Sequence, residues 1–193
     1  MNIFVVEDCP IKCARALPDK LVVKMPLESA QMLSTAHRLL SPHEYCEEMS
    51  LYKKAYYNHP CTIWARETDE NYRWLLIHWI SLCEEYYHRY GKYHASWVRL
   101  WDGLKIFPMN ITEGDLTPFA QAMPDEYKDQ TNPISAYRKY MVAEKHYAKW
   151  EKGTTKPRWW KYCSMWNVKY YCFFLVYIGC NNNYVCYYNY IEV

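Results

Sequence analysis

The sequence lacks the features that would direct the chain out of the cell or into a membrane. Its first ten residues, MNIFVVEDCP, have no basic segment ahead of their apolar residues, and the apolar run is too short for a secretory signal. The apolar run YYCFFLVYIG at 170–179 is too short to cross a bilayer as a helix. We therefore expect a cytoplasmic protein without membrane contact.

Cysteine patterns typical of metal sites or disulfide frameworks are also missing. The nine cysteines are an odd number, which argues against a closed disulfide framework, and without an export signal we expect reduced thiols. Cys9 and Cys13 have no second pair at matching spacing, and His59 with Cys61 is only a weak indication of zinc. The sequence therefore predicts neither a metal site nor a cofactor.

A strong excess of charge is missing as well, since 23 Lys and Arg face 21 Asp and Glu. The distribution is nevertheless uneven. Residues 1–127 hold 13 basic and 17 acidic residues, whereas residues 128–162 hold nine basic and three acidic ones. A basic segment of this kind is typical of a surface that binds an anionic partner, and equally of a helix whose lysines face solvent.

What the sequence does contain is helical periodicity, with no competing strand pattern before the last 31 residues. Apolar residues at helical spacing, with capping and stop signals, predict long helices at 19–41, 69–90 and 133–152 and a short one at 96–104. Turn-forming residues at 107–118 and 122–133 predict long loops. The expected fold is all-α, a single compact helical domain. The predicted helix starts and ends rest on Asp19, Pro42, Thr68 or Asp69, Gly91, Asn132, Pro133 and Gly153.

The last 31 residues, 163–193, have a different composition. They contain one Lys and one Glu, but four of the nine cysteines and seven tyrosines. Alternation in YVCYYNYIEV at 184–193 is compatible with a strand or a hairpin. We divide the chain into a helical domain at 1–162 and an aromatic, Cys-rich extension of unknown role, which we expect to be dispensable for chemistry.

A polar stripe follows one side of the predicted helix at 19–41. It consists of Lys24, Glu28, Gln31, Thr35 and Arg38, at steps of four and three residues. Such a stripe is either a solvent face or the wall of a cleft. A carboxylate beside a cation suits cleavage of a glycosidic bond, because the carboxylate can stabilise the positive charge that develops on the sugar. An amine could instead attack C1′ and form a Schiff base.

A second notable stretch is KPRWWKY at 156–162. Two neighbouring tryptophans cannot both face inward on a regular helix or strand, so we expect one of these rings at the surface among cations. Aromatic rings between basic residues are typical of surfaces that stack on bases and pair with phosphates. A clasp of aromatic rings over the core would have the same composition.

Several stretches, in their order along residues 1–162, resemble the phage endonuclease V type of pyrimidine-dimer DNA glycosylase. In that family an Asp precedes the catalytic Glu by nine residues on the first long helix, and here Asp19 and Glu28 have this spacing. The other matching stretches are Asn58-His59 before ENYRWLL, MPDEYK at 123–128, Glu144-Lys145, and KPRWWKY with Pro157.

This resemblance implies a DNA N-glycosylase that flips a base out of double-stranded DNA. It implies Glu28 as the catalytic carboxylate, and we place Lys24, Asn2 and His59 in the same catalytic site. We expect a monomer that acts without a cofactor. The expected DNA-binding residues are Gln31, Arg66, Lys145, Arg158, Trp159, Trp160, Lys161 and Tyr162.

The chain also departs from the family pattern. The family's nucleophile is the α-amine of residue 2, freed when Met is removed, and Asn2 is usually too large for that processing. Leu27 stands where the family has Arg, and Lys24 is an alternative amine. AP-lyase activity, the excised base, and the choice between repair and defence against modified phage DNA therefore stay open. Two other hypotheses are a non-catalytic nucleic-acid-binding helical module and a scaffold whose aromatic surface meets another protein.

Overall fold

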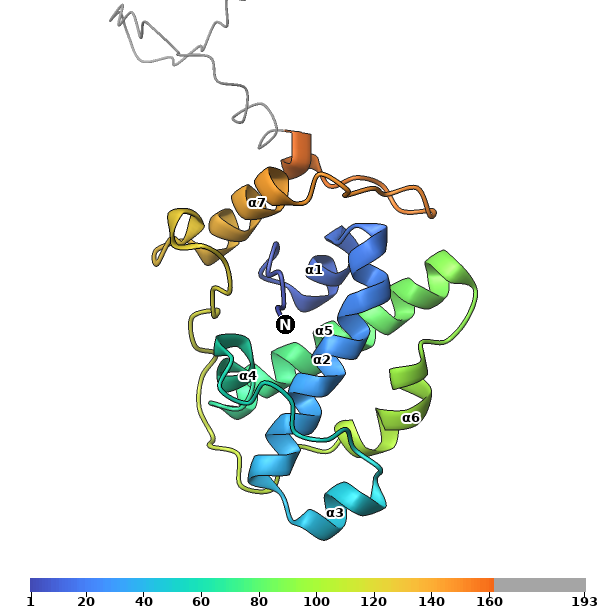
Figure 1. Cartoon of the computed structure of the whole chain (residues 1–193), viewed down its shortest axis with the longest axis vertical. Coiled ribbons are helices and arrows are strands. Elements are labelled where there is room, and N and C mark those ends of the chain that lie inside the picture. The colour runs from blue at the N-terminus through green and yellow to red at the C-terminus, as the bar shows by residue number, and fades with distance from the viewer. Residues whose placement is uncertain (162–193) are drawn as a thin grey trace, which may run out of the picture.

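The two longest helices, α2 (Asp19–Leu40) and α5 (Asp69–Tyr90), pack against each other at the centre of this computed structural model, which describes residues 1–161 (Figure 1). The side chain of Thr68 caps α5 by accepting a hydrogen bond from the backbone N–H of Asn71 at 3.1 Å. Gly91 ends it in the left-handed conformation, at φ 66°. Both boundaries were predicted from the sequence.

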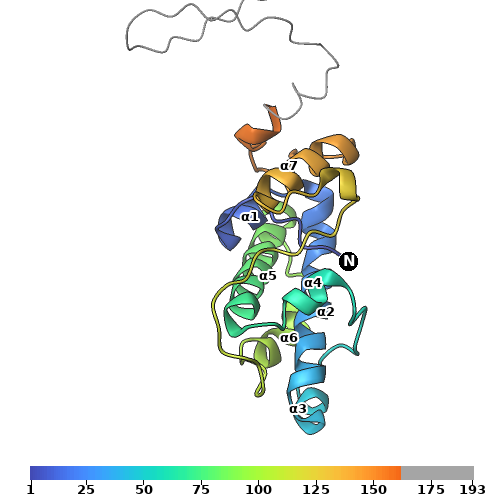
Figure 2. The same ribbon diagram turned by 90° about the vertical axis from the view of Figure 1, so that its left-hand side faces the viewer.

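Shorter helices surround this pair, and α7 covers the end where α1 lies while α3 forms the opposite end (Figures 1 and 2). Residues 1–161 hold seven complete α-helices, one 3-10 helix, further helical residues at 158–161 and no strand, which confirms the all-α prediction. The short helix predicted at 96–104 is α6. The remaining elements are α1 (Pro10–Ala16), α3 (His43–Glu48), α4 (Pro60–Trp64), α6 (Ala95–Leu104), η1 (Asp125–Tyr127) and α7 (Pro133–Glu144).

The core lies where α1, α2 and α5 meet. Trp79 and Tyr72 of α5 are fully buried, as are Met25 and Leu33 of α2. Burial of large apolar side chains is the main stabilising contribution to such a helical domain. One polar group inside this core is His37, whose Nε2 lies 3.0 Å from the hydroxyl of Tyr72.

One predicted N-cap, Asp19, and one predicted helix end were wrong. The N-cap of α2 is Pro18, and Asp19 is the first helical residue. The helix predicted at 133–152 ends at Glu144, because the chain after it turns back along the protein instead of continuing to Gly153. Its return is fixed by long-range bonds that no local pattern specifies: the backbone N–H of Asp19 donates to the carbonyl of Lys149 at 2.8 Å. The short helices α1, α3 and α4 were not predicted.

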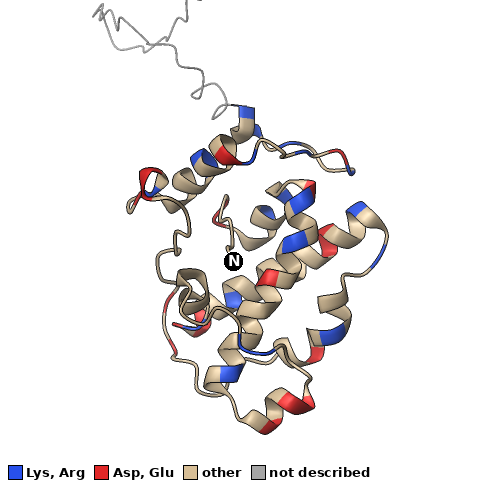
Figure 3. Cartoon of the chain, in the orientation of Figure 1, with Lys and Arg blue, Asp and Glu red and all other residues tan. Residues whose placement is uncertain are grey.

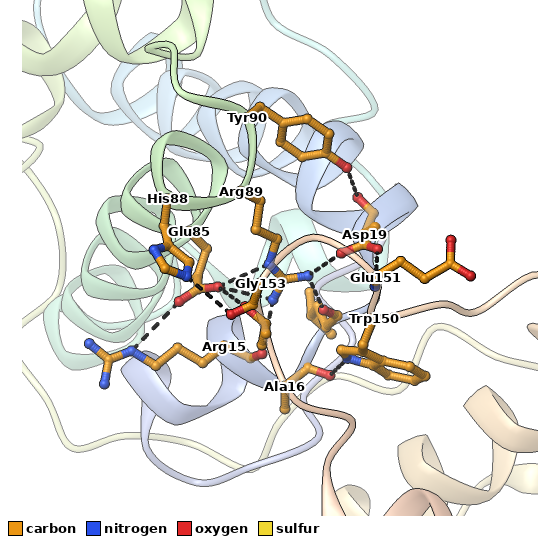
Figure 4. Close-up of polar contacts among 12 residues, drawn as sticks. Arg15, Ala16, Asp19, Glu85, His88, Arg89, Tyr90, Trp150, Glu151 and Gly153 are labelled. Atoms are coloured by element: carbon orange, nitrogen blue, oxygen red, sulfur yellow. Dashed lines mark hydrogen bonds and ion pairs between the residues drawn. The ribbon is translucent and has the colours of Figure 1, made fainter.

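A buried ionic network explains both the position of Asp19 and the return of the chain (Figure 4). The side chain of Arg89 is fully buried and lies 3.0 Å from Asp19 Oδ1 and 3.0 Å from Glu85 Oε2. The second oxygen of Asp19 accepts the backbone N–H of Glu151 at 2.7 Å. Asp19 therefore joins α2 and α5 to the segment that leads to the basic end of the chain.

Tyr162 and the extension at 163–193 lie outside the described residues, so their predictions stay untested. Within residues 1–161 no helix is both long and apolar enough to cross a membrane.

Candidate active site

The carboxylate of Glu28 is the centre of a charged cluster on α2. The residue is 9 % exposed, and its Oε1 lies 2.9 Å from the ammonium of Lys24, one turn earlier. Its Oε2 accepts the backbone N–H of Asn2 at 3.0 Å and lies 3.8 Å from the N-terminal amine of Met1. The N-terminal end of the chain therefore closes on Glu28.

The side chain of Asn2 holds the N-terminal segment in place. Its Oδ1 accepts the backbone N–H groups of Ile3 at 2.7 Å and Phe4 at 3.2 Å, while its Nδ2 donates to the carbonyl of Ala122 at 2.7 Å. The hydroxyl of Tyr137 lies 2.9 Å from the same Oδ1. Phe4 has φ 57°, so the backbone turns tightly around the amide oxygen. Asn2 thus fixes where the amine and the backbone nitrogen meet Glu28.

His59 lies beside this cluster as the N-cap of α4. Its Nδ1 accepts the backbone N–H of Cys61 at 3.2 Å. Burial lowers the pKa of His59 below its ordinary 6.5, and the N-terminal amine lowers it further, against the opposing effect of Glu28. His59 is therefore neutral at neutral pH, and because Nδ1 is an acceptor, Nε2 carries the proton.

Lys24 is exposed on the outer side of the cluster, where 66 % of its side chain is accessible. Its hydrogen bond and charge attraction to Glu28 raise its pKa above the ordinary 10.5. An ammonium held in the protonated form has no lone pair to attack a sugar. Of the two amines near Glu28, the N-terminal one is therefore the better placed for nucleophilic chemistry.

The polar stripe on α2 is neither a plain solvent face nor uniformly open. Glu28 is largely buried, Thr35 is fully buried, and Gln31 and Arg38 are half-buried. Thr35 Oγ1 accepts the backbone N–H of Ala55 at 3.1 Å, so a later loop covers this part of the helix. The loop at Ala55 therefore covers the stripe at Thr35, and the N-terminal segment covers it at Glu28.

Two of the predicted DNA-binding residues lie close to the N-terminal segment. Arg66 donates to the carbonyl of Thr62 at 2.7 Å, and the hydroxyl of Thr62 lies 3.2 Å from the sulfur of Met1. Lys145 lies 4.6 Å from the ring centre of Tyr140 and 5.7 Å from that of Phe4, and its ammonium donates to the Tyr140 hydroxyl at 3.1 Å. Both cations therefore border the segment that approaches Glu28.

The basic end follows α7, and Lys and Arg recur along α7 and the segment after it (Figure 3). Trp159 is 9 % exposed and turned toward the guanidinium of Arg138, 5.6 Å away. Trp160 is half-buried against Trp150, with ring centres 4.9 Å apart. Arg158 is exposed. One tryptophan thus belongs to the core edge, and Trp160 is the ring that retains partial access to solvent.

Several residues that build the site were not predicted. Tyr137 reaches Asn2 across 135 positions, and Ala122 does so from a loop. No local pattern encodes such pairs, since their meeting depends on how α7 packs. The described part of the chain contains no group of three His, Cys, Asp or Glu that could hold a metal ion.

The cluster of Glu28, the N-terminal amine and a neutral His59 combines an anion, an amine and a hydrogen-bond donor. In a comparison with protein families, the family model for pyrimidine dimer DNA glycosylase matches residues 1–98. This range includes all four predicted catalytic residues and ends within α6. No curated protein and no solved structure matches the chain.

Proposed function

The chain belongs to the pyrimidine dimer DNA glycosylase family, and we propose that it excises a damaged or modified base from double-stranded DNA at Glu28. The observation that carries this proposal is the approach of the N-terminal end to one carboxylate oxygen. Oε2 of Glu28 lies 3.0 Å from the backbone nitrogen of Asn2 and 3.8 Å from the amine of Met1.

In the proposed reaction the bond between C1′ of the sugar and the base nitrogen breaks, and its electron pair leaves with the base, which takes up a proton. Positive charge develops on C1′ and the ring oxygen. The carboxylate of Glu28 stabilises that charge, and its low exposure strengthens the effect because little water screens it. His59 offers the N–H of Nε2 to the DNA, since its Nδ1 already caps α4.

The N-terminal amine is the proposed nucleophile for an AP-lyase step. Its lone pair bonds to C1′ as the base departs, its proton passes to Glu28, and the product opens to a Schiff base that permits strand cleavage by β-elimination. Whether the mature chain begins at Met1 or at Asn2, the nitrogen of its first residue lies close to Glu28. Lys24 is the ion-pair partner of Glu28 rather than the attacking amine.

The DNA-binding surface that we propose combines residues near Glu28 with the basic part of the chain at 128–162. Gln31 lies one turn beyond Glu28 on α2, and Arg66 and Lys145 border the N-terminal segment. Arg158 and Lys161 add cations where residues 128–162 carry six more basic than acidic residues. Phosphate contacts of this kind position the duplex without reading its sequence.

The test is incubation with duplexes that each carry one damaged or modified base, with mass spectrometry of the released bases and borohydride trapping of covalent intermediates. We expect release of a free base and an adduct on the N-terminal residue, whose identity the intact mass gives. Release from damaged duplexes supports repair, and release only from bases found in modified phage DNA supports defence. DNA binding without release of any base would contradict the proposal and favour the non-catalytic binding module.

A further inference from the structure

A second feature on the face of Glu28 is the loop between α3 and α4, residues 53–58 with the sequence KKAYYN. It crosses over α2 on the side where the N-terminus lies (Figures 1 and 2). The backbone N–H of Ala55 donates to Thr35 Oγ1 at 3.1 Å, and the same hydroxyl lies 3.3 Å from the Ala55 carbonyl. Thr35 is seven residues beyond Glu28, about 10 Å along the helix axis.

The loop presents two tyrosines to solvent. Tyr56 is 73 % exposed and Tyr57 is 47 % exposed, with the ammonium of Lys54 4.9 Å from the centre of the Tyr57 ring. Tyr56 also has φ 45°, a left-handed conformation that costs a bulky residue free energy and that Gly or Asn adopts more easily. A large aromatic ring therefore stands in solvent on a backbone that does not favour it.

The far end of the loop is joined to the catalytic cluster. The carbonyl of Tyr56 accepts the backbone N–H of His59 at 2.9 Å, and His59 is the residue whose pKa responds to both the N-terminal amine and Glu28. The near end is held by Arg38, which donates to the carbonyls of Tyr52 at 3.1 Å and Leu51 at 2.7 Å. The ring of Tyr56 is thus presented by a loop anchored at both ends, beside the site.

The charge around the loop is positive. Residues 51–66 contain Lys53, Lys54 and Arg66 and no Asp or Glu. Arg99 adds a further cation, since its guanidinium lies 5.0 Å from the ring centre of Tyr52 and donates to the carbonyl of Ser50. Of the nearby acids, Glu47 is engaged by Arg38. Exposed rings among cations fit an unstacked nucleic-acid base with its phosphates better than an apolar protein surface.

We propose that this loop binds the opened part of the DNA duplex, with Tyr56 stacked on a base that loses its neighbour when the target nucleotide is flipped out of the helix, and with Lys53 and Lys54 bound to phosphates. The inference rests on the proposed function, because an opened duplex is the product of base flipping. It assigns to Tyr56 a role in specificity: the ring favours opened DNA over intact DNA, whose bases are already stacked.

The experiment uses the full chain and two duplexes of one sequence, one intact and one with a single tetrahydrofuran abasic analogue. Tyr56→Asn removes the ring and suits the left-handed backbone, so it should fold at least as stably as the parent. We expect it to bind the abasic duplex about 5- to 100-fold more weakly, with less than a twofold change for the intact duplex. Tyr56→Phe should retain the preference, and Tyr93→Ala, at a tyrosine 63 % exposed elsewhere, should change neither affinity.

The two lysines are tested through salt dependence. Lys53→Gln with Lys54→Gln should reduce the slope of log affinity against log salt by about 0.9 for each lost phosphate contact, whereas Lys92→Gln should leave it unchanged. If Tyr56→Asn keeps the parental preference for the abasic duplex, the inference is wrong, while base release would still support the proposed function. Equal weakening on both duplexes, or a dimer of the parent that dissociates in Tyr56→Asn, would overturn it as well. If no duplex releases a base, the proposed function fails, yet the Tyr56-dependent preference for the abasic duplex can still be measured.

Discussion

The hydroxyl of Tyr137 lies 2.9 Å from Oδ1 of Asn2, so α7 holds the N-terminal segment although 135 positions separate the two residues. Both are buried, with Asn2 6 % exposed and Tyr137 fully covered. The position of the N-terminal amine next to Glu28 therefore depends on a helix that follows the segment matched by the family model.

Tyr137→Phe should loosen the N-terminal segment without disturbing the core packing of the ring. The hydroxyl also lies 2.8 Å from the carbonyl of Ala120 and accepts the backbone N–H of Ala122 at 3.2 Å, so its loss should lower the free energy of unfolding by about 1–3 kcal/mol. Base release under single-turnover conditions should slow, while DNA affinity stays within twofold, because the phenol acts through Asn2 and touches no DNA. Tyr127→Phe is the matched control, since its hydroxyl meets the exposed Glu144 and its loss should be nearly silent. Equal rates in both variants would show that Asn2 needs no support from α7.

The boundary between what the sequence predicts and what it does not follows from the range of the interactions. Thr68 and Gly91 set the ends of α5 by local backbone chemistry, and both were predicted. The end of α7 was not predicted. Hydrogen bonds to Asp19 and Glu85, and not the periodicity of the sequence, set the path of the residues after Glu144. At the site, Glu28 and Lys24 share one helix and were found together, whereas the support from Tyr137 and Ala122 arises from tertiary packing.

Lys24→Gln should slow base release without abolishing it. Removing the ammonium 2.9 Å from Glu28 removes the hydrogen bond that orients one carboxylate oxygen, while the N-terminal amine keeps its place beside the other. Stability should fall by at most about 1 kcal/mol, because Lys24 is exposed. Lys24→Arg keeps the charge and a donor for Glu28, so its single-turnover rate of base release should stay near that of the parent. A borohydride adduct that disappears only in Lys24→Gln would make Lys24 the nucleophile and contradict the assignment to the N-terminal amine.

The basic end should control the electrostatic part of DNA affinity. Replacing Arg158 and Lys161 by Gln should flatten the salt dependence of binding by about 0.9 in slope for each lost phosphate contact. Lys92→Gln with Lys105→Gln removes the same charge in the loop before α6 and at the end of α6, and serves as the control. An unchanged slope would place the duplex away from α7 and its following segment.

Trp160→Ala tests stacking separately and should weaken DNA binding by about 1–3 kcal/mol if that ring stacks on a base.

The stability of the domain should decline in mild acid because of two buried histidines. Burial lowers the pKa of both His37 and His78 from 6.5 to about 4. The unfolded chain therefore binds protons near pH 6.5 that the folded chain binds only near pH 4. Stability is full above about pH 6.5 and falls as the pH drops to 4, by about 3 kcal/mol for each histidine.

Urea unfolding at several pH values between 7.5 and 4 measures this decline. His78→Asn keeps a donor for the carbonyl of Pro10, which Nδ1 of His78 meets at 3.1 Å, and removes the titration. Its stability should fall about half as steeply as that of the parent. A parent whose unfolding midpoint is the same at pH 7 and pH 4.5 would show that neither histidine is held neutral.

Glu28→Gln is the decisive substitution for the proposed chemistry. The amide preserves the size of the side chain and an oxygen that can accept the backbone N–H of Asn2, so the N-terminal segment should stay in place. It removes the negative charge that would stabilise the sugar cation, and base release should fall by about two to four orders of magnitude. DNA affinity should persist or rise, because a carboxylate near phosphates repels them. Glu84→Gln, at an exposed position of α5, is the control for charge alone. If Glu28→Gln releases the base at the parental rate, Glu28 serves only to hold Lys24 and the N-terminal segment, and the mechanism fails. If it binds an abasic duplex and still forms a borohydride adduct at the N-terminus, the amine attacks without the carboxylate, and Glu28 acts in bond cleavage alone.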